Sequence, residues 1–170
     1  MTRSKYTFKH NGDLTIEDAK ILYHNFNGDE RQFNPKGTRS VNVIIDDTDF
    51  AQQLQEEGWK VKLRAPKADG EVPIYHVPVF IRYDVVPPRV YMITANGRKK
   101  TLLDEHTVGM LDNMDLITVD IEIHPYEWDH VSHQKKAYVT DMYCTVEDKS
   151  AFARKYDFDA QDEEEELPFN

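Results

Sequence analysis

Short runs of alternating hydrophobic and polar residues recur along this chain, which is the pattern of β-strands that bury one face. The clearest run covers residues 116–124, where four aliphatic residues are expected on the core face: Ile117, Val119, Ile121 and Ile123. Less regular runs predict further strands at residues 14–26, 41–45, 60–64, 74–83, 89–94 and 136–146. In 60–64 the alternation places Val61 and Leu63 inward and leaves a basic stripe on the other face, formed by Lys60, Lys62 and Arg64.

Apolar residues at helical spacing interrupt this strand pattern. Asp47 or Thr48 can cap a helix over residues 49–57, and Gly58 is suited to end it. Two further short helices are expected, at residues 104–113 and 149–156. Polar turns are expected at residues 96–100 and 126–134.

The order of these elements suits a small antiparallel β-barrel. The oligonucleotide/oligosaccharide-binding (OB) fold has five strands with a helix between the third and the fourth, and residues 104–113 take that place if the strand from Leu116 is the fourth. The helix at 49–57 and the strand material at 74–94 are then additions. The predicted fold class is therefore mainly β, an OB-like barrel with two or three short helices.

A chain of 170 residues is long enough for one domain with a real core. We expect a flexible basic arm over residues 1–13, the barrel domain over 14–156 and an acidic tail over 157–170. Cys144 is the only cysteine, so no intramolecular disulfide and no cysteine metal cluster can form, and a reducing cytoplasm is the expected setting. No apolar run approaches the roughly 20 residues that span a bilayer, and no secretory signal is recognisable at the N-terminus.

Basic and aromatic residues are interleaved along the predicted barrel. Binding of single strands without sequence preference needs cations for the phosphates and flat side chains on which bases stack. The loop between the first two strands, which in an OB fold overhangs the binding face, carries both kinds. For the aromatic candidates other than Phe33, packing in the core is the competing interpretation. The candidate nucleic-acid-binding residues are Arg31, Phe33, Lys36, Arg39, Trp59, Lys60, Lys62, Arg64, Tyr75, Arg82, Tyr83, Arg89, Tyr91, Arg98, Lys99 and Lys100.

Charge is concentrated at the C-terminal end. Residues 157–170 hold seven of the 31 acidic residues and none of the 21 basic ones, so they carry −7 of the formal net charge of −10. Such a segment repels itself and buries little apolar surface, and we expect it to be extended and solvated. The body, at −3, is close to neutral, and the acidity of the whole chain does not argue against a body that binds nucleic acid.

The last residues resemble the acidic tip of bacterial single-stranded DNA-binding proteins, in which several acids precede Ile-Pro-Phe or Leu-Pro-Phe. The resemblance implies a tail that recruits replication and recombination proteins, such as a polymerase, helicase or recombinase, and competes for the DNA groove. Asn170 is a departure, because in that family the terminal carboxylate belongs to the phenylalanine. The matching, partner-binding residues are Asp162, Glu163, Glu164, Glu165, Glu166, Leu167, Pro168 and Phe169.

The strand pattern and length of the body look like those of single-domain single-stranded DNA-binding proteins of bacteriophages. The resemblance implies an OB-type barrel that coats and protects single-stranded DNA during replication, recombination or repair. It implies no enzymatic activity, no cofactor and no metal, and a location in the cytoplasm of a bacterial host. The oligomeric state, the length of DNA covered and any binding to RNA or duplex DNA stay open.

Two other functions compete with this hypothesis. An interaction protein or DNA mimic could occupy a partner's nucleic-acid site, although a mimic is expected to spread its acids over the folded body. A metal-dependent nuclease could use the segment 124–133, which holds His124, His130 and His133. Imidazole and carboxylate ligands suit zinc, manganese or iron, but the spacing of these histidines matches no standard site.

Overall fold

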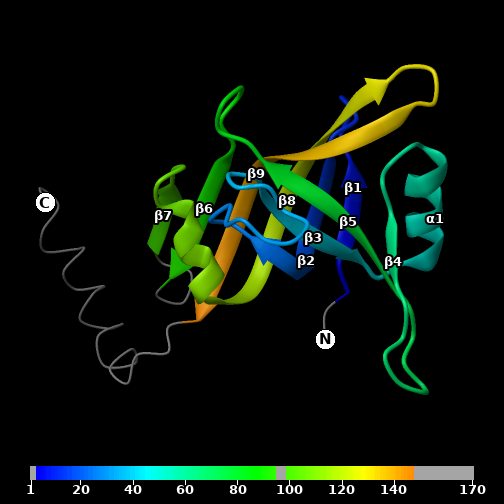
Figure 1. The fold of residues 1–170 in the computed structure, drawn as a ribbon, viewed down its shortest axis with the longest axis horizontal. Coiled ribbons are helices and arrows are strands. Elements are labelled where there is room, and N and C mark those ends of the chain that lie inside the picture. Colours follow the sequence, from blue (N-terminus) through cyan, green and yellow to red (C-terminus); the bar gives the residue numbers. More distant parts are fainter. Residues whose placement is uncertain (1–2, 95–98, 148–170) are drawn as a thin grey trace, which may run out of the picture.

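The computed structural model describes residues 3–94 and 99–147, which form one nine-stranded sheet with an α-helix and a 3-10 helix (Figure 1). The predicted helix at 149–156, the acidic tail and Arg98 lie outside the described residues. The helices are α1 (Thr48–Glu56) and η2 (Val108–Asn113). The strands are β1 (Lys5–Phe8), β2 (Leu14–Asn25), β3 (Arg39–Ile45), β4 (Lys62–Arg64), β5 (Ile74–Ile81), β6 (Arg89–Thr94), β7 (Lys99–Leu103), β8 (Asp115–Asp129) and β9 (Gln134–Glu147).

Five of these strands close into a barrel. β2 pairs with β3, β3 with β5, β5 with β9, β9 with β8, and β8 returns to β2. The β5–β9 pairing is parallel and the other four are antiparallel. η2 lies between the third and fourth barrel strands, β5 and β8, where the OB fold has its helix. The predicted fold class is confirmed.

The third barrel strand differs from the one that the sequence pattern predicted. β5, predicted as part of an addition, is the third barrel strand, and β4 is a three-residue strand on its edge. The additions are therefore α1, β4 and the hairpin of β6 and β7, which extends the sheet from β9. The prediction that Leu63 faces the core is wrong, because its side chain is 57% exposed on the short edge strand β4.

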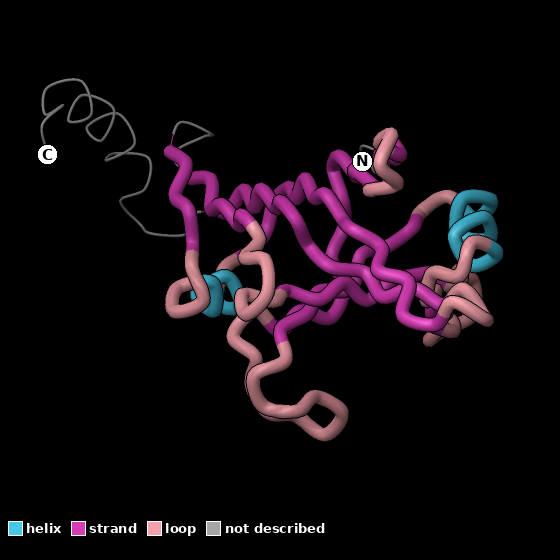
Figure 2. The backbone as a smooth tube through the Cα atoms, turned by 90° about the horizontal axis from the view of Figure 1, so that it is seen from above, coloured by secondary structure: helices cyan, strands magenta, loops and turns pink. Residues whose placement is uncertain are grey.

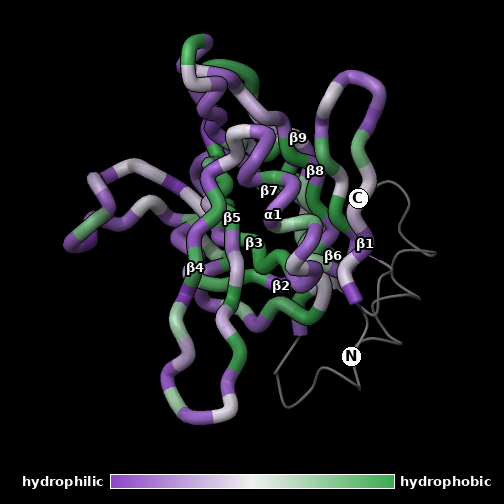
Figure 3. The backbone as a smooth tube through the Cα atoms, turned by 90° about the vertical axis from the view of Figure 1, so that its right-hand side faces the viewer, coloured by the Kyte–Doolittle hydropathy of each residue, from purple (hydrophilic) through white to green (hydrophobic). Residues whose placement is uncertain are grey.

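The core fills the inside of the barrel with alternate residues of its strands. β3 and β5 each contribute three buried aliphatic residues, and β8 contributes Val119, Ile121 and Ile123. Figure 3 shows these hydrophobic stretches gathered around the barrel interior. The helices lie at opposite ends of the molecule (Figure 2). η2 buries Leu111, and α1 buries Leu54, so each end of the core is covered by one helix.

Ile117 was expected in the core and is 62% exposed. The pairing of β8 with β9 shifts register between Leu116 and Thr118, which is a β-bulge. A bulge inserts one extra residue into a strand and moves it out of the alternation. Strict period-two counting through this segment therefore assigned Ile117 to the wrong face.

Strands extend further than the sequence pattern predicted at three places. The N-terminal arm contains β1, which pairs with the start of β2. The predicted turn at 126–134 is largely strand, because β8 runs to Asp129 and β9 begins at Gln134. Lys99 and Lys100 belong to β7 and not to a turn. Within the described ranges, no helix is long and apolar enough to span a bilayer.

The outer ends of β8 and β9 form a hairpin arm, defined here as residues 124–138, that is attached to the end of α1. Gly58 follows α1 with φ of 94°, and its carbonyl oxygen accepts a hydrogen bond of 2.9 Å from the backbone nitrogen of Lys135. A Cβ on Gly58 would come within 1.9 Å of the carbonyl oxygen of His133. Only glycine allows both this backbone conformation and this contact.

We expect Gly58→Ala to lower the free energy of unfolding by at least about 2 kcal/mol, because it combines left-handed backbone strain with a backbone clash. Gly70→Ala is a matched control, since Gly70 has φ of 87° but no atom lies within 4 Å of the place that a Cβ would take there. That control is expected to lose about 1 kcal/mol or less. Chemical denaturation of both variants measures the difference, and equal losses would contradict the clash with the hairpin arm.

Candidate nucleic-acid interface

Three aromatic side chains lie next to one another across the outer face of the barrel. His124 of β8 is paired with Tyr138 of β9, Tyr138 with Phe80 of β5, and Phe80 with Ser40 of β3. Their neighbours Ile123, Val139 and Val79 are buried, so by alternation this set faces outward. We call His124, Tyr138 and Phe80 the aromatic row. The rings of Phe80 and Tyr138 are 6.1 Å apart between centroids.

Cations accompany the aromatic row. The ammonium group of Lys136 lies 5.7 Å from the ring centroid of Phe80, and Lys136 is paired with Tyr126 on the hairpin arm. Arg82 and Arg39 line a cavity of about 400 Å³ together with Phe80, Lys136 and Tyr138. A surface of flat rings with positive charge beside them can stack bases and contact phosphates at the same time.

A second group of polar and basic residues lies on the neighbouring strands of the same outer face. His76 of β5 is paired with Lys62 of β4 and with Ile44 of β3. Its Nδ1 is 2.8 Å from the amide oxygen of Asn42, and its ring contacts the half-exposed Tyr23. Burial, followed by the charges of Lys62 and Arg64, lowers the pKa of His76. The imidazole is therefore held neutral within a basic surface.

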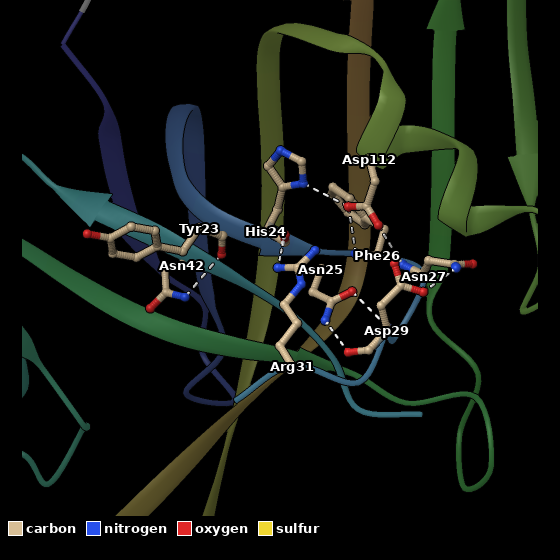
Figure 4. A network of polar contacts seen from close by, with 9 residues as sticks. All are labelled: Tyr23, His24, Asn25, Phe26, Asn27, Asp29, Arg31, Asn42 and Asp112. Atoms are coloured by element: carbon tan, nitrogen blue, oxygen red, sulfur yellow. Dashed lines mark hydrogen bonds and ion pairs between the residues drawn. The ribbon is translucent and has the colours of Figure 1, made fainter. Parts of the chain in front are cut away.

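The loop between β2 and β3, residues 26–38, is fixed to the barrel by side-chain hydrogen bonds (Figure 4). Asp112 of η2 accepts hydrogen bonds of 2.9 Å from the backbone nitrogens of Phe26 and Asn27, and it contacts His24 Nδ1 at 2.7 Å. Asn25, which is 3% exposed, donates to the Asp29 carbonyl and accepts from the Asp29 backbone nitrogen. These bonds satisfy backbone groups that strand pairing leaves free.

The far part of this loop is held by Asn34. Its side-chain nitrogen donates to the carbonyl oxygens of Asp29, Pro35 and Thr38 at 2.9 to 3.1 Å. Phe33 stands beside this anchor with 91% of its surface exposed. The prediction that Phe33 is exposed is confirmed, and its proposed contact with DNA stays a prediction. A stiff loop presents such a ring at a low entropic cost of binding.

The other predicted arginines near the barrel are held by polar contacts. Arg31 donates to the carbonyl oxygen of His24 at 3.3 Å, and Arg39 donates to the carbonyl oxygen of Glu105 at 3.0 Å. Arg82 forms two hydrogen bonds with Asp84, at 3.0 and 2.7 Å. These contacts orient the guanidinium groups without burying them fully. Lys36, Lys60 and Lys62 are exposed.

Several predicted aromatic residues are not part of this surface. Trp59 is 4% exposed and belongs to the core, so its prediction as a stacking residue is wrong. Tyr75 is half-buried and packs against the core. Tyr83 also packs against the core, but it lines the cavity beside Phe80, and the guanidinium carbon of Arg39 lies 5.6 Å from its ring centroid. Tyr91 stacks on Tyr143 at 4.9 Å between centroids, at the β6 end of β9.

The remaining predicted cations within the described residues lie on β6 and β7. Lys100 lies 4.7 Å from the ring centroid of Tyr91. Arg89 forms an ion pair with Asp141 at 2.6 Å between Nε and Oδ1. Lys99 is exposed at the start of β7. Lys99 and Lys100 of β7 thus lie apart from the aromatic row, whereas Arg89 of β6 lines a cavity together with His124 and Tyr138.

The residues proposed for nuclease chemistry do not converge. His124 Nδ1 lies 2.7 Å from the buried carboxylate of Asp13, whereas His130 and His133 both contact Glu127. In residues 3–94 and 99–147 no group of three or more potential ligands is arranged to hold a metal ion. Burial, with a smaller effect of Asp120, raises the pKa of the Cys144 thiol to about 12, so this thiol is protonated at neutral pH.

Sequence reasoning missed Phe80, Tyr138, Tyr126 and Lys136. The alternation of β5 already indicated that Phe80 faces outward, since Val77, Val79 and Ile81 take the core positions. An aromatic residue at an outward strand position is therefore a usable sequence signal for a binding surface. The pairing that brings Tyr138 beside Phe80 joins strands 58 positions apart, and no local pattern encodes it.

The family described as putative phage ssDNA-binding domain matches residues 1–167 of this sequence. Because the match covers nearly the whole chain, the protein belongs to this family. No curated protein matches the chain in sequence.

Solved structures from bacteriophage Enc34 resemble the fold. The single-stranded DNA-binding protein of that phage in complex with ssDNA aligns with a TM-score of 0.51 and 10% identity, over 89% of this chain and 96% of the Enc34 chain. A C-terminal truncation of the Enc34 protein aligns with a TM-score of 0.49 and 11% identity, over 88% of this chain and 94% of that one. At about 10% identity, the similarity of this chain to the Enc34 protein in the complex supports the barrel fold alone.

The lowered pKa of His76 predicts a dependence of stability on pH. The unfolded chain, with a histidine pKa of about 6.5, binds a proton more readily than the folded protein, so stability falls as the pH drops below that value toward the folded pKa. We expect His76→Gln, which keeps a polar partner for Asn42, to lose part of this acid sensitivity. Thermal denaturation of the unmodified protein and of His76→Gln between pH 7.5 and about 5 measures how the stability of each depends on pH. If the stability of both proteins falls equally with pH, His76 is not responsible for the acid sensitivity.

Proposed function

We propose that this protein binds single-stranded DNA along the outer face of its barrel and thereby coats and protects it during phage DNA replication and recombination. The observation that carries the proposal is the aromatic row, which starts in the hairpin arm with His124 and Tyr138, continues to Phe80 on β5 and has Lys136 beside it. In OB folds the face of the second and third strands and the two loops beside it bind oligonucleotides. Here these strands are β3 and β5, and β5 carries Phe80 of the row. Membership of the phage ssDNA-binding family supports the same ligand.

The proposed mechanism involves binding without chemistry. Bases of an unpaired strand stack on Phe33, Phe80 and Tyr138, and each stack is worth roughly 1 to 3 kcal/mol. Phosphates lie against Lys136, Lys62 and the arginines at the edge of the face. Because every base has a flat surface, such a site tolerates any sequence. Stacked bases are held away from complementary strands, which hinders reannealing.

The acidic tail is proposed to recruit other proteins of DNA replication or recombination. Its motif, residues 162–169, combines acids that attract basic partners with a short apolar end that can enter a pocket. In the absence of a partner the acids repel DNA from the barrel face or compete with it.

The first test measures binding of labelled oligo-dT at two salt concentrations. We expect affinity to fall steeply with salt, because phosphate contacts release counterions. Phe33→Ala is expected to weaken binding by more than about 1 kcal/mol. Leu102→Ala is a matched control, since Leu102 is also exposed (59%) but lies on β7. Absence of oligo-dT binding in dilute buffer would overturn the proposed function.

A second test removes the tail. Deletion of residues 157–170 takes away a formal charge of −7, so single-strand affinity is expected to stay equal or to rise. Binding of replication or recombination proteins, measured by pull-down with the full chain as control, is expected to disappear. Markedly weaker DNA binding after the deletion would contradict the competing role of the tail.

A further inference from the structure

An apolar groove lies on the outer face at the end of the aromatic row formed by His124 and Tyr138. Its cavity measures about 710 Å³, within the usual range of ligand sites. Three residues of the hairpin arm line it, His124, Tyr126 and Tyr138, and we call them the floor. Residues 85–88 of the loop between β5 and β6, two valines and two prolines, also line it, and we call them the roof. We call this cavity the roofed groove.

The roofed groove is continuous with the proposed binding face. Tyr138 and Arg82 line both this groove and the neighbouring cavity that contains Phe80 and Lys136. Tyr138 is paired with Phe80 on one side and with His124 on the other. A strand that stacks along the aromatic row therefore reaches the groove without leaving the surface.

The roof has properties that core packing does not explain. Val85 is 70% exposed and Val86 is 78% exposed, so neither valine is buried by the barrel. Pro87 and Pro88 restrict the backbone of the loop. A restricted loop that lines a cavity together with aromatic rings loses little entropy when a flat apolar ligand enters.

Cations stand at the borders of the groove. Arg82 and Arg89 both line it, with side chains that are 50% and 66% exposed. Their carboxylate partners are Asp84 and Asp141. The Arg82–Asp84 pair is exposed on both sides, and such pairs are weak, so a phosphate can accept hydrogen bonds from the Arg82 guanidinium group in place of the carboxylate. Asp141 is only 17% exposed and holds Arg89 more firmly. The groove thus offers apolar walls for bases and positive groups for the connecting backbone.

We propose that the roofed groove is a subsite for unpaired bases of the bound strand, and that it lets the protein discriminate single-stranded from duplex DNA. This inference rests on the proposed function. Only a base without its pairing partner can slide between the roof and the rings of the floor, because a duplex keeps its bases stacked and paired inside the helix. Contacts with phosphates, by contrast, are available to both forms of DNA.

The test uses the full chain with both roof valines replaced, Val85→Ser and Val86→Ser, so that apolar contact is lost and no charge is added. Fluorescence anisotropy with labelled oligo-dT and with a duplex of equal length measures both affinities. We expect single-strand affinity to fall about 5- to 30-fold and duplex affinity to stay unchanged. Val72→Ser is the matched control, because Val72 is 75% exposed on the loop before β5 and is expected to have no effect.

A second measurement addresses the floor of the groove. Tyr126→Ala removes a ring that is 55% exposed, so the fold is expected to persist, and single-strand affinity is expected to fall as in the roof variant. With the unmodified protein, affinity is expected to rise once the oligonucleotide is long enough to reach the groove. The roof variant and Tyr126→Ala are expected to lack this gain. The gain would mark the length at which a strand reaches the groove.

The outcomes separate this inference from the function on which it rests. If the roof and floor variants bind oligo-dT like the unmodified protein while Phe80→Ala binds more weakly, the subsite is refuted and the proposed function stands. If the variants lose duplex and single-strand affinity equally, the discriminating role is refuted. If the unmodified protein does not bind oligo-dT at all, the proposed function itself fails.

Discussion

A short parallel contact between β5 and β9 is the constraint on which the rest of the molecule depends. Two residue pairs, Val79 with Ala137 and Phe80 with Tyr138, close the five-stranded barrel. The inner pair is buried in the core, and the outer pair forms the centre of the aromatic row. The same contact therefore completes the hydrophobic interior and builds the surface proposed to bind DNA. Folding and binding share these four residues because alternate strand positions face opposite sides.

The loops around that surface are held by elements from elsewhere in the chain. Asp112 of η2 bonds to the start of the loop with Phe33, and Gly58 after α1 supports the hairpin arm. Each helix thus covers one end of the core and fixes one border of the face. Positioning of this kind lets exposed aromatic residues keep a defined direction although they gain nothing from burial.

The sequence predicted the elements that local patterns encode and failed where distant segments meet. The strand at Leu116, the helix after Asp47 and the helix before β8 follow from periodicity and capping, and all three are present. The choice of β5 as the third barrel strand depends on its pairing with β9, which lies 58 residues further along. Trp59 shows the same limit, because its burial depends on contacts that alternation cannot reveal. Phe33 could be recognised, since a polar, basic loop offers it no cover.

β9 divides one of its edges between two partners, with β5 along its first half and β6 along its second. The chain from Ile81 to Asp115 leaves the barrel on that edge and returns for β8, so the whole excursion is added beside the closing pairs and does not pass through them. The length of this excursion can change without moving the pairs that close the barrel, as long as its end still supplies Leu111 to the core and Asp112 to the loop with Phe33.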